Sequence, residues 1–141
     1  MSFLKSCIVL LLISLFTVAC SKSISSNEAA EEGYVVYGNG GVLNYELFAQ
    51  FLDKVNKSES AIVKFAKYTD EGDPIFHTLE FDDDSKDFTY TYDSRDDEFG
   101  KKEKVTTKCR TLSKDKNGTF GFIGCENDEV GKRFNAKEQI Q

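Results

Sequence analysis

The second half of the chain alternates between hydrophobic and polar residues with a period of two, and this pattern restricts the fold more than any other feature. From Ser60 onward, runs that favour extended structure are separated by short acidic or glycine-containing breaks. The runs occupy residues 61–69, 74–81, 86–93, 103–112 and 119–125. Connections this short join antiparallel neighbours, because a parallel crossover needs a dozen or more residues. The pattern therefore predicts an antiparallel sheet of about five strands.

One segment before these strands has helical periodicity. Between Leu43 and Lys57, hydrophobic side chains fall on one stripe and charged side chains occupy the opposite side. Asn44 suits the N-cap position. Such a stripe can bind a partner, but more often it faces the core. The predicted fold class is therefore α+β, with one amphipathic helix packed on the sheet, while residues 34–37 suit a short edge strand.

Two cysteines predict a crosslink in the last hairpin. Cys109 and Cys125 are symmetric about Asn117, and a loop at 116–118 places Gly118 where a positive φ is needed. This register sets the cysteines opposite each other, as a bridge between neighbouring strands requires. A redox site is the alternative, but the C-x-x-C spacing is missing. We predict a disulfide that closes a loop of about 15 residues and contributes about 3 kcal/mol.

The N-terminus has the features of an export signal. Lys5 precedes an apolar stretch at 7–18, which is shorter than the roughly 20 residues of a membrane span. The segment Thr17-Val18-Ala19-Cys20 resembles a bacterial lipobox, in which the cysteine accepts a lipid. An ordinary signal peptide cut elsewhere and an uncut anchor are the alternatives. With palmitate-like chains on Cys20, the protein would be held at the outer face of the cell membrane.

These signals divide the chain into four predicted parts. Residues 21–33 are small, polar and acidic and bury too little apolar surface to fold alone. In the C-terminal part, Phe134 is the residue best suited to dock on the domain. The parts are a lipoprotein signal peptide (1–19), a lipidated cysteine with a flexible tether (20–33), a globular domain (34–126) and a polar C-terminal tail (127–141).

Charge is segregated along the chain, whose net charge is −6. This balance argues against nucleic-acid binding, which needs a basic surface. Residues 69–100 carry 12 acids and two bases, whereas residues 101–117 carry seven bases and two acids. Either opposite charges pair across neighbouring strands on a solvated face, or the two regions form a bipolar binding surface.

The candidate binding residues lie in two loops, at 70–74 and 93–102. They are Asp70, Glu71 and Asp73 in the first loop, and Arg95 and Asp96 in the second. We expect Arg95 to anchor its loop by pairing with Asp70, Asp73 or Asp96, with binding of a ligand carboxylate as the alternative.

We interpret the remaining acids and the single histidine as structural residues. The acids at 70–73 and 82–84 offer oxygen ligands for Ca²⁺, but neither has the spacing of a known calcium loop. His77 shares an apolar strand face with Ile75 and Leu79, which favours a packed histidine over a general base. We therefore predict no metal site, no cofactor and no catalytic residue.

Several motifs, in order along the chain, resemble those of an uncharacterised family. They are YTDEGDPI at 68–75, YTYD at 90–93, SRD at 94–96, FG at 99–100 and GCE at 124–126. The chain is similar over residues 33–126 to small secreted lipoproteins of Gram-positive, Bacillus-type bacteria, which carry a domain of unknown function and a YT-x-EGDPI motif. The resemblance implies location and a shared fold but no activity.

The function predicted is that of a membrane-anchored extracytoplasmic lipoprotein, most simply a non-catalytic binding module. Its expected contacts are the membrane, through the lipid, and an envelope protein or small ligand. One alternative is an envelope-acting enzyme that uses carboxylates of the 70–74 and 93–102 loops, which requires a concave site joining them. Another is a structural or stress-related envelope protein.

Overall fold

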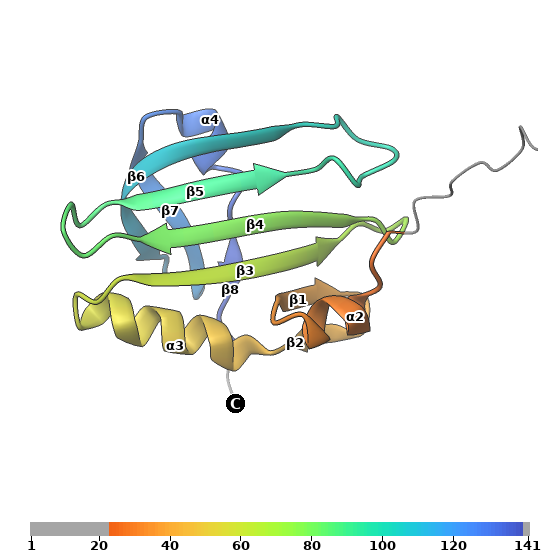
Figure 1. Cartoon of the computed structure of the whole chain (residues 1–141), viewed down its shortest axis with the longest axis horizontal. Helices are drawn as coiled ribbons and strands as arrows, with labels where there is room; N and C mark the ends of the chain where they lie inside the picture. The colour runs from red at the N-terminus through yellow and green to blue at the C-terminus, as the bar shows by residue number, and fades with distance from the viewer. Residues whose placement is uncertain (1–22, 140–141) are drawn as a thin grey trace, which may run out of the picture.

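The computed structural model describes residues 23–139, and the predicted signal peptide and Cys20 lie outside this part. An eight-stranded sheet curls around the core as a half-barrel, with strand order β2-β1-β3-β4-β5-β6-β7-β8 (Figure 1). The elements are α2 (Ser26–Glu31), β1 (Val35–Gly38), β2 (Gly41–Leu43), α3 (Tyr45–Asn56), β3 (Ala61–Tyr68), β4 (Pro74–Phe81), β5 (Phe88–Asp93), β6 (Lys104–Lys114), β7 (Thr119–Cys125), α4 (Asp128–Gly131) and β8 (Ala136–Lys137).

This mostly β architecture contradicts the predicted α+β fold of one helix on five antiparallel strands. The five predicted strands exist as β3 to β7, but β1, β2 and β8 extend the sheet. Strand β1 runs parallel to β3, with Val35 opposite Phe65, so the sheet is mixed. The added strands have only two to four residues, too few for a clear alternation.

Strand β1 lies inside the sheet rather than at its edge. Val35 and Val36 are both buried, because Val35 faces the main core and Val36 faces a smaller cluster on the outer side. A strand that is covered on both faces has a continuous hydrophobic run. The β-prone segment at 34–37 therefore belongs to a buried strand.

Helix α3 lies within the predicted helical segment and packs against the concave side of the sheet. Phe48 and Phe51 are buried, and the ring centroid of Phe48 lies 5.2 Å from that of Phe65 and 5.1 Å from that of Phe120. Asn44 occupies the N-cap position, but its side chain makes no capping hydrogen bond. Its amide instead donates to the carbonyl oxygens of residues 30 and 34, at 2.8 and 3.1 Å.

Residues 26–31 form a helix, although this segment was predicted to be part of a flexible tether. The Ser25 hydroxyl accepts a hydrogen bond from the Glu28 backbone, and the Glu28 carboxylate accepts one from the Ser25 backbone. This capping box fixes the start of α2. Ala29 is 0% exposed and packs with Val36 and Ala66 on the outer face of the sheet. A small side chain lets the helix approach closely, so the segment folds while carrying little apolar surface.

The C-terminal segment belongs to the core rather than forming a separate polar tail. Val130, Phe134 and Ala136 are all buried. The Phe134 ring lies 5.3 Å from the ring of Phe65 and 5.4 Å from that of Phe122. The docking expected of Phe134 is therefore confirmed, but single apolar residues between polar ones give no helical or strand periodicity, so the sequence pattern did not reveal the packing of Val130 and Ala136.

The predicted disulfide between Cys109 and Cys125 is present. The two residues are directly opposed in the β6–β7 ladder, and Gly118 in the hairpin loop has a φ of 76°. Helix α4 packs against this bridge at Gly131. A Cβ atom at residue 131 would lie 2.3 Å from the Cys125 sulfur, so only glycine fits there.

Replacing Phe134 with alanine should lower the free energy of unfolding by about 3–5 kcal/mol, because it leaves a cavity between Phe65 and Phe122 in the core. Urea denaturation of the purified protein measures the loss. Phe99→Ala is the matched control, since Phe99 is 76% exposed. The control should change stability by no more than about 0.5 kcal/mol. Equal effects of the two substitutions would contradict the buried position of Phe134.

Gly131→Ala should destabilise the fold by about 1–3 kcal/mol, because the added methyl group overlaps the disulfide. Gly121→Ala is the comparison, since a Cβ there would meet the Phe134 carbonyl oxygen at an ordinary 3.7 Å. Thermal unfolding under oxidising conditions should place the 131 variant well below the 121 variant. The reverse order would show that α4 does not pack on the bridge as described.

Candidate binding site

The two loops that carry the predicted binding residues meet at one end of the sheet. The Asp73 carboxylate accepts a hydrogen bond from the Glu98 backbone at 3.0 Å, which links the 70–74 turn to the 93–102 loop. Within the turn, the Thr69 backbone donates to the Asp73 carbonyl oxygen and Gly72 has a φ of 94°. The DEGDPI sequence is therefore a turn-forming motif at the start of β4.

Arg95 anchors its own loop, but with a different partner from those predicted. Its guanidinium donates to both carboxylate oxygens of Asp93, at 2.9 and 2.7 Å, and not to Asp70, Asp73 or Asp96. Lys104 on the neighbouring strand lies 3.8 Å from the same carboxylate. The hydrogen bond from Arg95 is the main cause that lowers the pKa of Asp93. The local charge is therefore balanced at the point where β5 ends.

Other acids in the long loop also shape the backbone. Asp97 is 8% exposed, and its carboxylate accepts hydrogen bonds from the backbones of Phe99 and Gly100 at 3.1 and 2.9 Å. The Ser94 hydroxyl donates to the Lys101 carbonyl oxygen at 2.6 Å. By contrast, Asp70, Glu71 and Asp96 are exposed. Because Glu98 is exposed as well, the loops present four acids to solvent from a scaffold that other acids hold in place.

Part of the charge segregation is explained by pairing across strands. Asp93 on β5 and Lys104 on β6 are opposed in the ladder, as well as being an ion pair. Lys114 reaches Glu138 at 3.1 Å, beside the C-terminal strand. A cavity of about 480 Å³ near the disulfide is lined by both signs of charge, from Asp87, Lys108, Arg110 and Glu126. Acidic and basic regions therefore adjoin on the folded surface.

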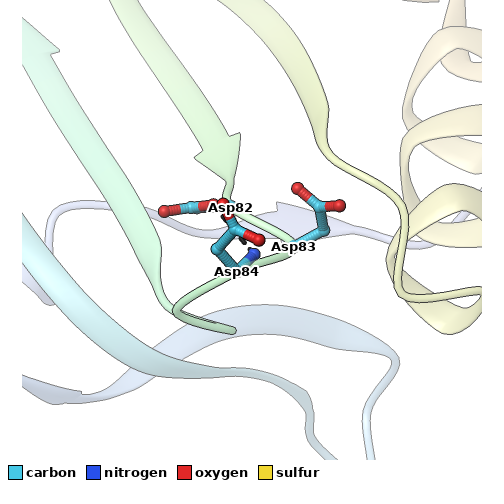
Figure 2. Close-up of side chains that lie close together, drawn as sticks. All are labelled: Asp82, Asp83 and Asp84. Carbon is cyan, nitrogen blue, oxygen red and sulfur yellow. Dashed lines mark hydrogen bonds between the residues drawn. The ribbon is translucent and has the colours of Figure 1, made fainter.

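Three consecutive aspartates form a compact exposed group in the β4–β5 turn (Figure 2). One ligand atom from each of Asp82, Asp83 and Asp84 lies within 4.8 Å of the others. The Asp82 carboxylate accepts hydrogen bonds from the Asp84 backbone and the Ser85 hydroxyl, both at 3.0 Å. The bond from the Asp84 backbone is the main cause that lowers the pKa of Asp82. Turn formation accounts for this arrangement.

The single histidine is a core residue, as its strand face predicted. His77 is 3% exposed, and its Nδ1 atom shares a hydrogen bond of 2.8 Å with the Tyr90 hydroxyl. Burial, with a further contribution from the charge of Lys67, lowers the pKa of His77 to about 3. The imidazole is therefore neutral at physiological pH and holds β4 and β5 together from inside the half-barrel.

A partly buried lysine lies near this histidine. Lys67 donates to the backbone carbonyl and side-chain oxygens of Asn135, and its Nζ atom lies 5.4 Å from the ring centroid of Tyr37. Burial lowers the pKa of Lys67 to about 8. The sequence analysis did not select Lys67, although alternation with Phe65 indicated an inward-facing position. Its role is to tie β3 to the segment before β8.

A concave site opens on the outer face of the sheet, beside the β3–β4 turn. Its volume is about 440 Å³, and α2, the β1–β2 hairpin and the turn surround it. We call it the hairpin pocket. Its floor is formed by Val36 and Gly38 of β1 and their partners Leu43 and Gly41 of β2. The remaining lining residues are Ser25, Ser26, Asn27, Asn39, Gly40, Tyr68, Thr69 and Gly72.

The hairpin pocket does not join the two acidic loops as the enzyme alternative requires. It touches the 70–74 turn only at Gly72, and residues 93–102 do not line it. The pocket was not predicted from the sequence, because residues 38–41 were assigned to no element and Ser25 to Asn27 were assigned to the tether. The signal available was the unusual density of glycine directly after a hydrophobic run.

Together, these features define a small, curled β-sheet domain with structural acidic loops and a pocket whose described lining is uncharged. The chain belongs to the family defined by a domain of unknown function, DUF4362, whose model matches residues 32–120. The match covers the two acidic loops and most of the hairpin pocket, and it ends in β7. No curated protein and no solved structure matches the chain. Within residues 23–139, no helix has the length and apolar character needed to cross a membrane.

The buried histidine should make stability depend on pH above the range where carboxylates titrate. Unfolded histidine binds a proton near pH 6.5, whereas folded His77 does so only near pH 3. The unfolded state therefore binds more protons between these two pH values. The free energy of unfolding should consequently fall by about 1.4 kcal/mol per pH unit on acidification below pH 6.5. Lowering the pH from 7.5 to 5.0 should cost about 2 kcal/mol in urea denaturation.

The control for this prediction is His77→Gln, which removes the titrating group. This variant should be less stable than the native protein at neutral pH but should show a nearly flat profile between pH 5 and 7.5. An unchanged slope in the variant would assign the pH dependence to other groups.

Proposed function

We propose that this protein is a membrane-anchored extracytoplasmic lipoprotein whose domain binds a ligand or partner in the cell envelope and is not catalytic. The observation that carries the proposal is the position of Cys20, at the end of a lipobox-like segment and immediately before a folded domain. Residues 1–19 would then be the signal peptide, and Cys20 would carry the lipid. The YT-x-EGDPI motif further supports a place among Bacillus-type secreted lipoproteins.

The start of the folded domain is well suited to a short anchor. The Tyr68 hydroxyl donates to the Ile24 carbonyl oxygen at 2.9 Å, and α2 follows directly. Ile24 is the fourth residue after Cys20, so the chain between them spans at most about 14 Å. A lipid on Cys20 would therefore hold the α2 side of the domain close to the membrane surface.

The disulfide also favours export. Disulfides persist mainly in oxidising compartments and are rare in the cytosol. The Cys109–Cys125 bridge lies in the β6–β7 hairpin, where α4 covers it at Gly131. A bridge that is part of the packed structure is typical of a folding crosslink rather than of a redox site.

Binding is favoured over catalysis because the reactive side chains already have structural partners. His77 is bonded to Tyr90 inside the core, and Arg95 is paired with Asp93. The acidic loops use Asp73 and Asp97 as acceptors for backbone amides. The hairpin pocket, by contrast, has the volume of a small-ligand site and an uncharged lining. These contacts support a binding module.

Lipid attachment can be tested with an alkyne analogue of palmitate fed to a Gram-positive host that expresses the full chain. We expect the native protein to be labelled and to sediment with membranes. Cys20→Ser should remove the label and release the protein from the membrane fraction. Cys7→Ser is the matched control, since Cys7 lies within the proposed signal peptide, and it should leave labelling unchanged. Label on the Cys20→Ser protein, or none on the native protein, would refute the anchor.

A further inference from the structure

We propose that the hairpin pocket binds an uncharged sugar. The chemistry of the pocket carries this inference, and only the source of the sugar rests on the proposed envelope location. The floor, the polar rim and the absence of charged lining residues each contribute to the argument.

The floor of the pocket contains a glycine that the fold does not require. Gly38 lies within β1, and its φ is outside the left-handed region. A Cβ atom there would lie 4.0 Å from the Tyr68 side chain, which is an ordinary contact. Glycine inside a strand weakens it and often marks close approach of a ligand. The backbone conformation at residue 38 would accept a larger side chain. Glycine at this position therefore keeps the floor of the pocket open beside Tyr68.

The rim offers hydrogen-bonding groups that other side chains do not use. Within residues 23–139, the side chains of Ser26, Asn27 and Asn39 make no hydrogen bond to another group. Hydroxyl and amide groups can both donate and accept. Sugar hydroxyls have the same dual character, so each rim group can match them in either direction. The hydroxyl of Thr69, another lining residue, already accepts a hydrogen bond from the Asp73 backbone at 3.2 Å, so it is not counted among the free rim groups.

The remaining lining excludes charge and provides an apolar surface. Among residues 23–139, those that line the pocket include no lysine, arginine, aspartate or glutamate. A charged ligand would lose hydration there without gaining an ionic partner. Leu43, which is 39% exposed, and the ring of Tyr68 offer apolar contact, and the Tyr68 hydroxyl is fixed by its bond to the Ile24 carbonyl oxygen. An uncharged sugar, with a hydroxylated edge and a C–H face, fits this combination.

The pocket would lie near the membrane in the anchored protein. Ser25, on its rim, is five residues from Cys20, a span of at most about 17 Å. Two sources of an uncharged sugar are within reach there, the headgroup of a neutral glycolipid and an envelope polysaccharide. Both present the same chemistry to the pocket, and the experiment separates them.

The first test is calorimetric titration of the full-length protein in detergent with uncharged oligosaccharides, including chitotriose, gentiobiose and maltotriose. We expect saturable binding of at least one sugar. Gly38→Val fills the floor and should weaken that binding about tenfold or more, equal to roughly 1.4 kcal/mol. Asn27→Ala with Asn39→Ala should have a similar effect and leaves the core untouched. Ile62→Val, an exposed substitution outside the pocket, should bind as the native protein does.

Circular dichroism and thermal unfolding establish that each variant is folded, and the double asparagine variant serves if the Gly38 variant does not fold. No binding of any sugar at millimolar concentration would overturn the inference. It would also be overturned by undiminished binding in the folded pocket variants, or by a preference for phosphorylated or acidic sugars.

The second test separates the two sources. Vesicles containing diglucosyl diacylglycerol should recruit the Cys20→Ser protein if a glycolipid headgroup is the ligand, and Gly38→Val should abolish recruitment. Binding to free oligosaccharide without such recruitment assigns the pocket to a polysaccharide. Both results support the sugar inference. Palmitate labelling at Cys20 in a protein that binds no sugar would refute this inference while leaving the proposed anchor intact.

Discussion

Aromatic contacts across the interior hold the curled sheet closed. The sheet ends at β2 on one side and β8 on the other, and the rings of Phe48, Phe65, Phe120 and Phe134 fill the space between its two walls. The Tyr37 hydroxyl adds one polar link between the walls, to the Lys137 carbonyl oxygen at 3.0 Å. Apolar burial of this kind is non-directional, so the final curvature depends on which rings meet. The positions of α3 and of the C-terminal segment follow from that closure.

The acids of this chain act mainly on local backbone geometry. Asp73, Asp82 and Asp97 each accept backbone hydrogen bonds within or next to a turn. Each of these carboxylates fixes a turn or loop, and for Asp82 the bond from the Asp84 backbone also lowers the pKa. This local use of charge separates the acidic loops from the hairpin pocket, whose lining is neutral.

The sequence was informative where local chemistry and tertiary structure agree. Strands β3 to β7 were predictable because alternation and turn residues coincide, and the register of the last hairpin followed from Gly118 and the two cysteines. The remaining elements depend on distant partners. Ala29 is buried against Ala66, and no local pattern encodes this contact, whereas Phe134 was the one residue of the C-terminal segment expected to dock. The partner of Arg95 was missed because Asp93 offers a two-point contact, whereas the expected partners were Asp70, Asp73 and Asp96.

The candidate site was less predictable than the fold. The meeting of the two acidic loops could be anticipated from strand pairing, but the hairpin pocket could not. Its floor comes from β1 and β2, whose pairing is not evident from so few residues. Its rim comes from Ser25, Ser26 and Asn27, which look like tether until α2 docks.

Helix α2 has a mechanical consequence for an anchored protein. A force applied through Cys20 would reach α2 before any strand, because the helix is the first described element along the chain. Six helical residues measure about 9 Å, whereas the same residues extended measure about 20 Å. Peeling α2 from the sheet would therefore lengthen the attachment by about 11 Å. The same motion would remove one wall of the hairpin pocket, so the reach of the domain and the shape of its pocket are coupled through one short helix.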